Sequence, residues 1–148
     1  MRWLLDTNVV SESVRLKPDQ RVVAWGSSLD PSEVAISIVT LAELILGAAT
    51  ARDEERRRRV TRWIEAEIEP SFATRTLPLT VDILTNWLDL GRRLRVRGKQ
   101  LPGADSLIAA TARVHNLIIA TRNAKDFAGT GVTVYDPWTG RTHRMAEE

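Results

Sequence analysis

The sequence predicts a single α/β domain with a mainly parallel, five-stranded sheet and helices on both of its faces. Short apolar runs alternate along the chain with longer segments in which apolar residues recur at helical spacing. Such alternation is typical of domains built on a parallel sheet. The chain has 148 residues, of which 43% are hydrophobic and 27% are charged. This is the size and composition of one ordinary globular domain.

Composition excludes several classes of protein. The chain has no cysteine, which excludes a disulfide framework, a thiolate metal site and a cysteine nucleophile. No apolar run approaches the roughly 20 residues that span a bilayer, and the N-terminus lacks the features of a signal peptide. We therefore expect a cytoplasmic protein without a membrane partner. The formal net charge of +2 decides little, but clustered arginines suit phosphate groups and keep nucleic acid among the expected partners.

The first half of the chain begins with a buried strand at residues 3–5, an apolar run too short for a helix. The polar residues after it open a helix, and Asp19 or Gln20 opens another. Residues 34–38 are predicted as a strand from their β-branched content. Two helices follow this strand. Thr40 and Glu43 have the spacing of a capping box, so we expect Thr40 to cap the first of them.

The second of these helices is strongly charged, covers residues 52–69 and is expected to end at Pro70. The alternation then continues, with strands expected at 76–79, 117–121 and 132–135 and helices at 80–97 and 104–112. The sequence from Asp136 onward lacks periodicity. We therefore place the domain at residues 1–138 and expect residues 139–148 to form an irregular C-terminal tail.

Four polar residues occupy equivalent places in this predicted fold. Asp6 and Asn123 follow the ends of strands, whereas Glu43 and Asp105 lie in the first turn of helices. Strand ends and helix starts share one edge of a parallel sheet, so we expect the four side chains to converge at the crevice where such sheets bind ligands.

Each of these residues also has a plainer structural role open to it. Asp6 can cap the helix that follows it, and Glu43 can complete its capping box. Asp105 can complement a helix macrodipole, an effect worth about 0.3–1 kcal/mol. Asn123 fits a turn, and Asp126 can cap the segment after it.

Together, ionised carboxylates at one edge repel one another and need a compensating cation. The chain has no cysteine, and we set aside His115 as a structural residue and His143 as part of the tail. Carboxylate oxygens are hard ligands and suit Mg²⁺ better than zinc, with Mn²⁺ as an alternative. Such an ion lowers the pKa of a bound water and neutralises charge on a phosphodiester. The residues therefore predict a metal site for phosphodiester hydrolysis.

Four segments resemble the motifs of PIN-domain nucleases, and more closely those of the VapC/FitB type of toxin from bacterial toxin–antitoxin pairs. They occur in the family's order from Met1 to about Trp138. The segments are Leu4-Leu5-Asp6-Thr7-Asn8-Val9-Val10-Ser11-Glu12, Thr40-Leu41-Ala42-Glu43, Asp105 with the later Ile108-Ala109-Ala110-Thr111-Ala112, and Ala120-Thr121-Arg122-Asn123 with Asp126-Phe127.

This resemblance implies a Mg²⁺-dependent endoribonuclease, the toxin of a type II toxin–antitoxin module, which cleaves RNA phosphodiesters by a metal-activated water. It also implies a homodimer and a cognate small antitoxin, VapB- or FitA-like, through which alone the module binds operator DNA. By position, Asp6, Glu43 and Asp105 match acidic residues of the metal pocket. Thr7 and Thr121 match hydroxyl-bearing positions that support it.

The fourth acidic position departs from this pattern, because Asn123 stands where FitB-like members can have Asp. A neutral amide weakens a second metal site, so the number of metals stays open. We expect Asp6 and Asp105 to be primary ligands and Glu43 to be an outer ligand or a water-orienting base. Asn123 and Asp126 are expected to be auxiliary.

Two basic clusters are candidates for RNA contact. Arg56–Arg59 follow Glu54 and Glu55, which favours a salt-bridged, solvated helix face. The second cluster lacks acidic residues within it and leads into the loop before Asp105, so we expect it to hold the RNA backbone. It comprises Arg92, Arg93, Arg95, Arg97 and Lys99. Trp138 is open between stacking on RNA bases and anchoring the tail.

Two other functions stay open from the sequence. One is a phosphotransfer domain of the receiver or phosphatase type, which also begins with a strand that ends in Asp. Asn8 stands where the phosphatase needs a second Asp, and Lys125 is the nearby candidate for its lysine. The other is a catalytically weak PIN-like module that only binds RNA or an antitoxin.

Overall fold

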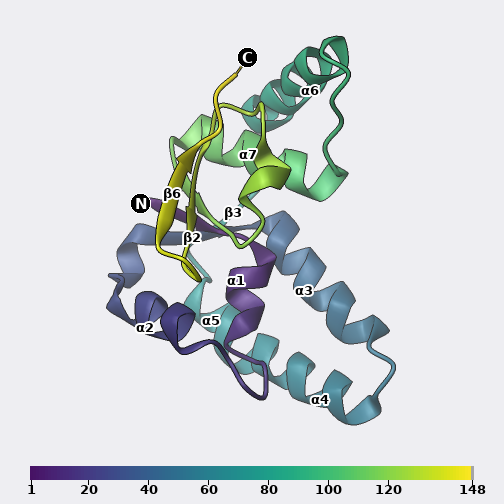
Figure 1. Ribbon diagram of the computed structural model, residues 1–148. Coiled ribbons are helices and arrows are strands. Elements are labelled where there is room, and N and C mark those ends of the chain that lie inside the picture. The colour runs from purple at the N-terminus through teal and green to yellow at the C-terminus, as the bar shows by residue number, and fades with distance from the viewer. Residues whose placement is uncertain (148) are drawn as a thin grey trace.

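A six-stranded sheet forms the centre of the computed structural model, which describes residues 1–147 (Figure 1). The strand order is β3-β2-β1-β4-β5-β6, with β6 antiparallel to β5 and the other neighbours parallel. The predicted α/β class with a mainly parallel sheet is confirmed. The strands are β1 (Trp3–Leu5), β2 (Val34–Ser37), β3 (Thr76–Leu77), β4 (Ile118–Ala120), β5 (Thr133–Asp136) and β6 (Arg141–Arg144).

Helices connect the parallel strands. Between β1 and β2 lie α1 (Thr7–Glu12), α2 (Gln20–Ser28) and the 3₁₀ helix η1 (Pro31–Glu33). Between β2 and β3 lie α3 (Ile38–Thr50), α4 (Glu54–Trp63), the π-helical segment η2 (Ile64–Ile68) and α5 (Glu69–Ser71). Between β3 and β4 lie α6 (Val81–Val96) and α7 (Gly103–His115), and the 3₁₀ helix η3 (Ala124–Phe127) precedes β5. In the described part of the chain, no helix combines the length and the apolar character needed to cross a membrane.

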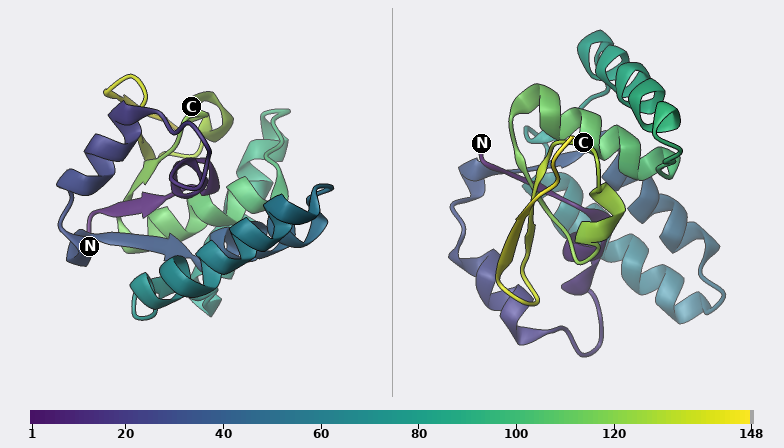
Figure 2. Two further views of the ribbon diagram at one scale, coloured as in Figure 1. Left: turned by 90° about the horizontal axis from the view of Figure 1, so that it is seen from below. Right: turned by 45° about the horizontal axis from the view of Figure 1, so that its top comes forward.

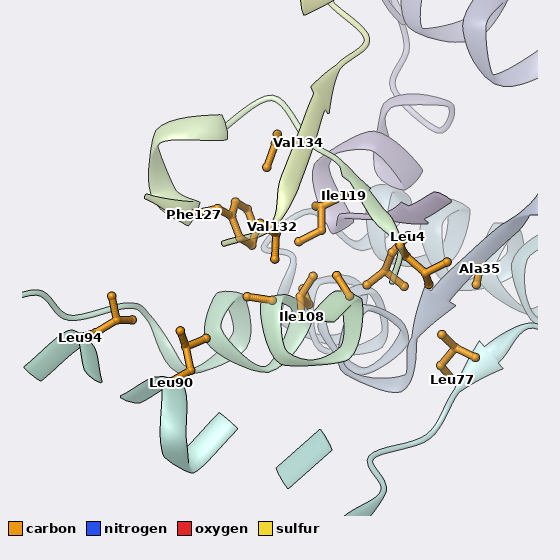
Figure 3. Close-up of a cluster of buried hydrophobic side chains, with 13 residues drawn as sticks. Leu4, Ala35, Leu77, Leu90, Leu94, Ile108, Ile119, Phe127, Val132 and Val134 are labelled. Atoms are coloured by element: carbon orange, nitrogen blue, oxygen red, sulfur yellow. The ribbon is translucent and has the colours of Figure 1, made fainter. Parts of the chain in front are cut away.

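The two faces of the sheet pack against different helices because successive residues of a strand point to opposite sides. Leu4 and Ile119 lie in a core cluster with Ile108 of α7 and with Leu90 and Leu94 of α6 (Figure 3). On this face α7 lies against the sheet, and α6 lies on the outer side of α7 (Figure 2). The opposite face, which includes Trp3 and Ile36, is covered by α1, α2 and α4 with the segment that follows it.

The centre of the sheet positions the candidate site. Strand β1 pairs with β2 on one side and with β4 on the other, so the strand order reverses direction at β1. Leu5 is in register with Ala120, and the Asp6 N–H donates to the Ala120 carbonyl at 2.9 Å. The residues that follow β1 and β4 therefore meet at the carboxyl edge of the sheet, at the switch point where such folds bind ligands.

The sixth strand was missing from the sequence prediction, and the expectation of an irregular tail is wrong for Arg141–Arg144. All four residues of β6 are exposed and polar, so they carry no hydrophobic alternation that could reveal a strand. A turn joins β5 to β6, with Gly140 at a positive φ of 74° and its N–H donating to the Asp136 carbonyl at 2.7 Å. Trp138, 5% exposed, anchors this turn in the core. Glu148, the last residue of the predicted tail, lies outside the described residues.

Pro70 does not end the charged helix, contrary to the sequence prediction. Helical structure continues from Glu54 to Ser71 through the π-helical segment η2. Proline lacks an N–H and clashes with the carbonyl four residues earlier in a regular α-helix. The wider turn of η2, in which the Glu69 N–H donates to the Ile64 carbonyl, lies directly before Pro70 and departs from that regular ladder.

We expect Ile108→Ala to lower the free energy of unfolding by about 2–5 kcal/mol, because this α7 side chain is fully buried in the core cluster with residues of the sheet and α6 and the vacated volume cannot fully collapse. Chemical denaturation followed by circular dichroism measures this change. Leu88→Ala on the neighbouring helix is the control: Leu88 is 64% exposed, and its change should stay within about 0.5 kcal/mol. Equal losses in the two variants would contradict the assigned packing.

Candidate functional site

Asp6 places a buried carboxylate at the C-terminal end of β1, where it is 5% exposed. Its Oδ1 accepts a hydrogen bond from the Thr7 N–H at 2.8 Å and so caps α1. Its Oδ2 accepts from the Thr121 hydroxyl at 2.8 Å and from the Asn8 amide at 3.3 Å. Asp6 therefore caps α1 through one carboxylate oxygen and is held by Thr121 and Asn8 through the other.

The pKa of Asp6 is raised above its ordinary value, chiefly because burial disfavours the ionised form. Hydrogen bonds from Thr121 and Thr7 act in the opposite direction, and the negative charges of Glu43 and Asp126 raise the pKa further. An ionised Asp6 is thus stabilised by fixed donors and destabilised by neighbouring acids. A cation bound at this point would remove the second effect.

Glu43 reaches the same edge from α3, and the predicted capping box is wrong. Helix α3 begins earlier than expected, with Ser37 as its N-cap and the Ser37 hydroxyl accepting from the Val39 N–H at 3.0 Å. The Thr40 hydroxyl is buried and has no hydrogen-bond partner within residues 1–147. Glu43 instead accepts from the Thr7 hydroxyl at 2.7 Å, which fixes its carboxylate beside the start of α1.

Asp105 lies half-buried in the first turn of α7. Burial raises the pKa of its carboxyl to about 6, and the charges of Asp6, Asp126 and Glu43 add to the effect. The macrodipole of α7 favours an ionised carboxylate at this position. Because the pKa is nevertheless raised, burial and crowding with other acids dominate over the structural role that the sequence left open.

The loop after β4 supplies Asn123 and Asp126. The Asn123 side chain is exposed, and its backbone N–H donates to the Thr121 hydroxyl at 3.1 Å. Asp126 lies half-buried in η3, and its charge raises the pKa of both Asp6 and Asp105. The fourth negative charge at this edge therefore comes from Asp126, three residues after the neutral Asn123.

Asn8 is a site residue whose role the sequence reasoning missed. Its amide donates to Thr121 at 3.1 Å as well as to Asp6, and its carbonyl oxygen accepts from the Arg122 N–H at 3.1 Å. Asn8 thus ties the turn after β1 to the turn after β4. Its position two residues after Asp6, in the first turn of α1, was the available signal. The sequence reasoning treated Asn8 as a capping candidate, as part of the nuclease-like motif and as a departure from the phosphatase pattern, and assigned it no role at the site.

The donor set of this acidic edge fits a hard divalent cation. Carboxylate, amide and hydroxyl oxygens predominate, and the charges of the neighbouring acids add to the raised pKa of Asp6 and of Asp105. Within residues 1–147, no group of three or more His, Cys, Asp or Glu side chains is arranged to hold a metal ion by itself. Mg²⁺ is commonly held by one or two carboxylates and retains several waters, so a complete protein ligand shell is not required.

The predicted RNA-binding cluster on α6 is partly neutralised, which corrects the expectation that it lacks acidic partners. Asp89 pairs with Arg92 and with Arg93 at 2.9 Å in each case, and Arg93 also pairs with Glu147 at 3.1 Å. The remaining members, Arg95, Arg97 and Lys99, are exposed near the C-terminal end of α6. Lys99 lines a hollow of about 350 Å³ together with Asp126 and Lys125.

The other aromatic and basic candidates are also placed. Trp138 is buried, and the Arg122 guanidinium lies 5.1 Å from its ring, so it anchors the tail in this structure. On the helix face expected to be salt-bridged, which lies on α4, Glu54 and Arg58 form an ion pair at 2.8 Å.

Comparison with known proteins places this geometry in a family. The family model described as PIN domain matches residues 3–131. Toxin FitB from Neisseria gonorrhoeae is 39% identical over 135 residues, which cover 91% of this chain and 97% of the relative. VapC ribonuclease Y4jK from Sinorhizobium fredii is 36% identical over 135 residues, which cover 91% of this chain and 96% of the relative.

Solved structures agree. FitAcB from Neisseria gonorrhoeae superposes with a TM-score of 0.86 at 39% identity, over 92% of this chain and 98% of that chain. FitAB bound to an IR36 DNA fragment superposes with a TM-score of 0.84 at 38% identity, over 92% of this chain and 95% of that chain. The similarity therefore covers nearly the whole chain on both sides.

We expect Asp105→Asn to stabilise the metal-free protein at neutral pH. The pKa of Asp105 is about 6 in the folded protein against an ordinary value of 3.8, so the folded state binds this proton more tightly than the unfolded state. Stability is therefore lost as pH rises from about 3.8 through 6. The full shift corresponds to roughly 3 kcal/mol, and solvent screening at a half-buried group reduces the expected gain to about 1 kcal/mol.

Denaturant unfolding of both proteins in EDTA, as a function of pH, measures this difference. The gain in the variant should be present above pH 6 and vanish below pH 3.8. A gain that is independent of pH, or a loss at neutral pH, would contradict crowding of acids at Asp105.

Proposed function

Because this chain belongs to the PIN-domain family, we propose that it is a ribonuclease toxin of a toxin–antitoxin pair, which cleaves RNA phosphodiesters with a bound Mg²⁺. The observation that carries this proposal is the acidic edge itself. Asp6 and Asp105 come from distant parts of the chain. Burial raises the pKa of both carboxyls, and the charges of Glu43 and Asp126 raise it further. The relatives named toxin and ribonuclease support the same activity.

The roles of the residues follow from their surroundings. Asp6 and Asp105 are the two carboxylates whose ionised forms are most disfavoured, so they gain most from a bound cation and are the proposed primary ligands. Glu43, held by the Thr7 hydroxyl, is placed to accept a proton from a water or to orient it. Asp126 adds negative charge, and Asn123, whose side chain is exposed, is the proposed auxiliary metal ligand.

Thr121 and Asn8 are positioning residues in this proposal. Both donate to Asp6 Oδ2, which leaves the carboxylate in one orientation and favours its ionised form. When bound, Mg²⁺ stabilises negative charge on the phosphodiester as a Lewis acid and lowers the pKa of a bound water. Mn²⁺, which prefers the same oxygen ligands, is the alternative ion.

The proposed partners are RNA, a second copy of the chain and a small antitoxin of the FitA or VapB kind. The FitAB relative was solved with a DNA fragment, which supports operator binding through the antitoxin. Exposed apolar residues on α3 and α6, including Ile45, Val81 and Leu88, provide surface that protein contacts could cover. We place this activity in the cytoplasm, where RNA is available.

The experiment that tests the proposal is an RNA cleavage assay with purified protein. Wild type should cleave RNA in Mg²⁺ and lose activity in EDTA. Asp6→Asn and Asp105→Asn should each lose more than about 100-fold, since even outer partners of metal ligands typically cost 10–100-fold. Asp82→Asn, an exposed acid at the start of α6, is the matched control and should retain activity. Cleavage that survives in EDTA or in Asp105→Asn would refute the metal-dependent mechanism.

A second comparison separates the two auxiliary residues. Asp126→Asn should reduce cleavage by about 10-fold or more because it removes a charge that acts on both Asp6 and Asp105. Asn123→Ala should have the smaller effect, since its side chain is exposed and neutral. Rates in limiting Mg²⁺ measure the difference, and the reverse order would assign the fourth position to Asn123.

A further inference from the structure

A groove leads away from the acidic edge between α1, α3 and α4. It has a volume of about 650 Å³, and Thr7 and Glu43, which belong to the acidic edge, also line it. Its other charged lining residues are all basic: Arg15, Lys17, Arg56 and Arg59. We name it the α1–α4 groove. It joins a negatively charged centre directly to a positively charged channel.

Arg59 is the unusual residue of this groove. Its Nε is buried and has no hydrogen-bond partner within residues 1–147. Arg58, its neighbour on the same helix, pairs with Glu54 at 2.8 Å. A buried donor without a partner destabilises the fold, and the cost is greater when the donor belongs to a charged group. Arg59 therefore lines the groove and carries an N–H donor that no acceptor within residues 1–147 satisfies.

A buried carboxylate holds the loop that carries Lys17 along the groove. Glu12 is 4% exposed, and it accepts from the Asp19 N–H at 2.9 Å and from Arg15 at 3.3 Å. These bonds fix both ends of the loop that carries Lys17 along the groove. Within residues 1–147, neither Lys17 nor Arg56 forms an ion pair. Their charges are available to a ligand.

The chemistry of the groove favours the backbone of a nucleic acid strand. A guanidinium offers a planar fork of donors that suits phosphate oxygens. Val14, Leu44 and Trp63 give the groove an apolar wall beside these cations. Basic residues combined with apolar and aromatic surface are typical of channels for single-stranded nucleic acid. By contrast, Arg92 and Arg93 on α6 are already paired with acids of this chain.

We propose that the α1–α4 groove binds the single-stranded RNA segment next to the cleaved phosphodiester, with Arg59 contacting a backbone phosphate and Lys17 a neighbouring one. This inference rests on the proposed ribonuclease function. It assigns substrate binding to α4 and the loop after α1, in place of the cluster on α6. Glu12 is then a positioning residue, because it holds the loop that carries Lys17.

Binding of a short unstructured RNA, measured by fluorescence anisotropy in the cleavage-deficient Asp105→Asn background, tests the proposal. Arg59→Gln should weaken binding by about 10-fold and reduce the slope of log affinity against log salt by about 0.7, the value for one phosphate contact on a single strand. Lys17→Gln, in an exposed loop whose folding does not depend on it, should reduce the slope similarly. Arg59→Lys should retain the slope, since it retains the charge.

Arg58→Gln is the matched control, with the same change of charge one residue away. It should alter affinity by less than about twofold, because Arg58 is exposed and ion-paired. Equal effects of Arg58→Gln and Arg59→Gln, or an unchanged salt slope in both Arg59→Gln and Lys17→Gln, would overturn the proposal. So would weaker binding of an acidic peptide to Arg59→Gln with RNA binding unchanged, which would assign the groove to a protein ligand.

The two proposals fail in different ways. If the chain with Asp105 intact does not cleave RNA in Mg²⁺ but the contrast between Arg58 and Arg59 persists in binding, the nuclease proposal is wrong and the RNA groove stands. If it cleaves RNA and the contrast is absent, the groove assignment alone is wrong.

Discussion

The site depends on one constraint: the buried carboxylate of Asp6 needs donors that stabilise its ionised form. Asp6 ends the central strand, and burial raises its pKa. Donors from two different connections hold it: the backbone of Thr7 after β1 and the hydroxyl of Thr121 after β4. This arrangement exists only because β1 and β4 are adjacent and in register. The pairing of two strands that are far apart in the sequence therefore sets the protonation chemistry of the site.

The other acids extend the same constraint. Glu43 and Asp105 come from two further connections, and Asp126 comes from the connection that also carries Thr121. The charges of Glu43 and Asp126 raise the pKa of both Asp6 and Asp105. A fold selected only for stability would gain from replacing one of them by a neutral residue. The proposed divalent cation gives a physical reason for keeping them, because it would turn mutual repulsion into shared coordination. The uncharged Asn123 fits this picture because Asp126 supplies charge nearby.

The sequence predicted the fold class and the acidic edge because both follow from local pattern and from the geometry of parallel sheets. It did not predict β6, whose four exposed polar residues show no alternation. The capping box failed because Ser37, three residues earlier, starts α3 first. Contacts between residues far apart in the sequence could not be predicted from local pattern either. Asn8 and Thr121 are 113 positions apart, and Arg93 pairs with Glu147, 54 positions away. Such pairings depend on topology, so residue type and spacing along the chain do not reveal them.

The central claim is that the acids of the carboxyl edge share one divalent cation. The most direct measurement is paramagnetic line broadening by substoichiometric Mn²⁺ in an amide NMR spectrum of the full chain. We expect the amide signals of Asp6, Asp105 and Asp126 to broaden together and before the others, and excess Mg²⁺ to reverse the effect. Broadening that begins at exposed acids such as Glu54 and Glu55, with the signals of Asp6 and Asp105 unaffected, would contradict it.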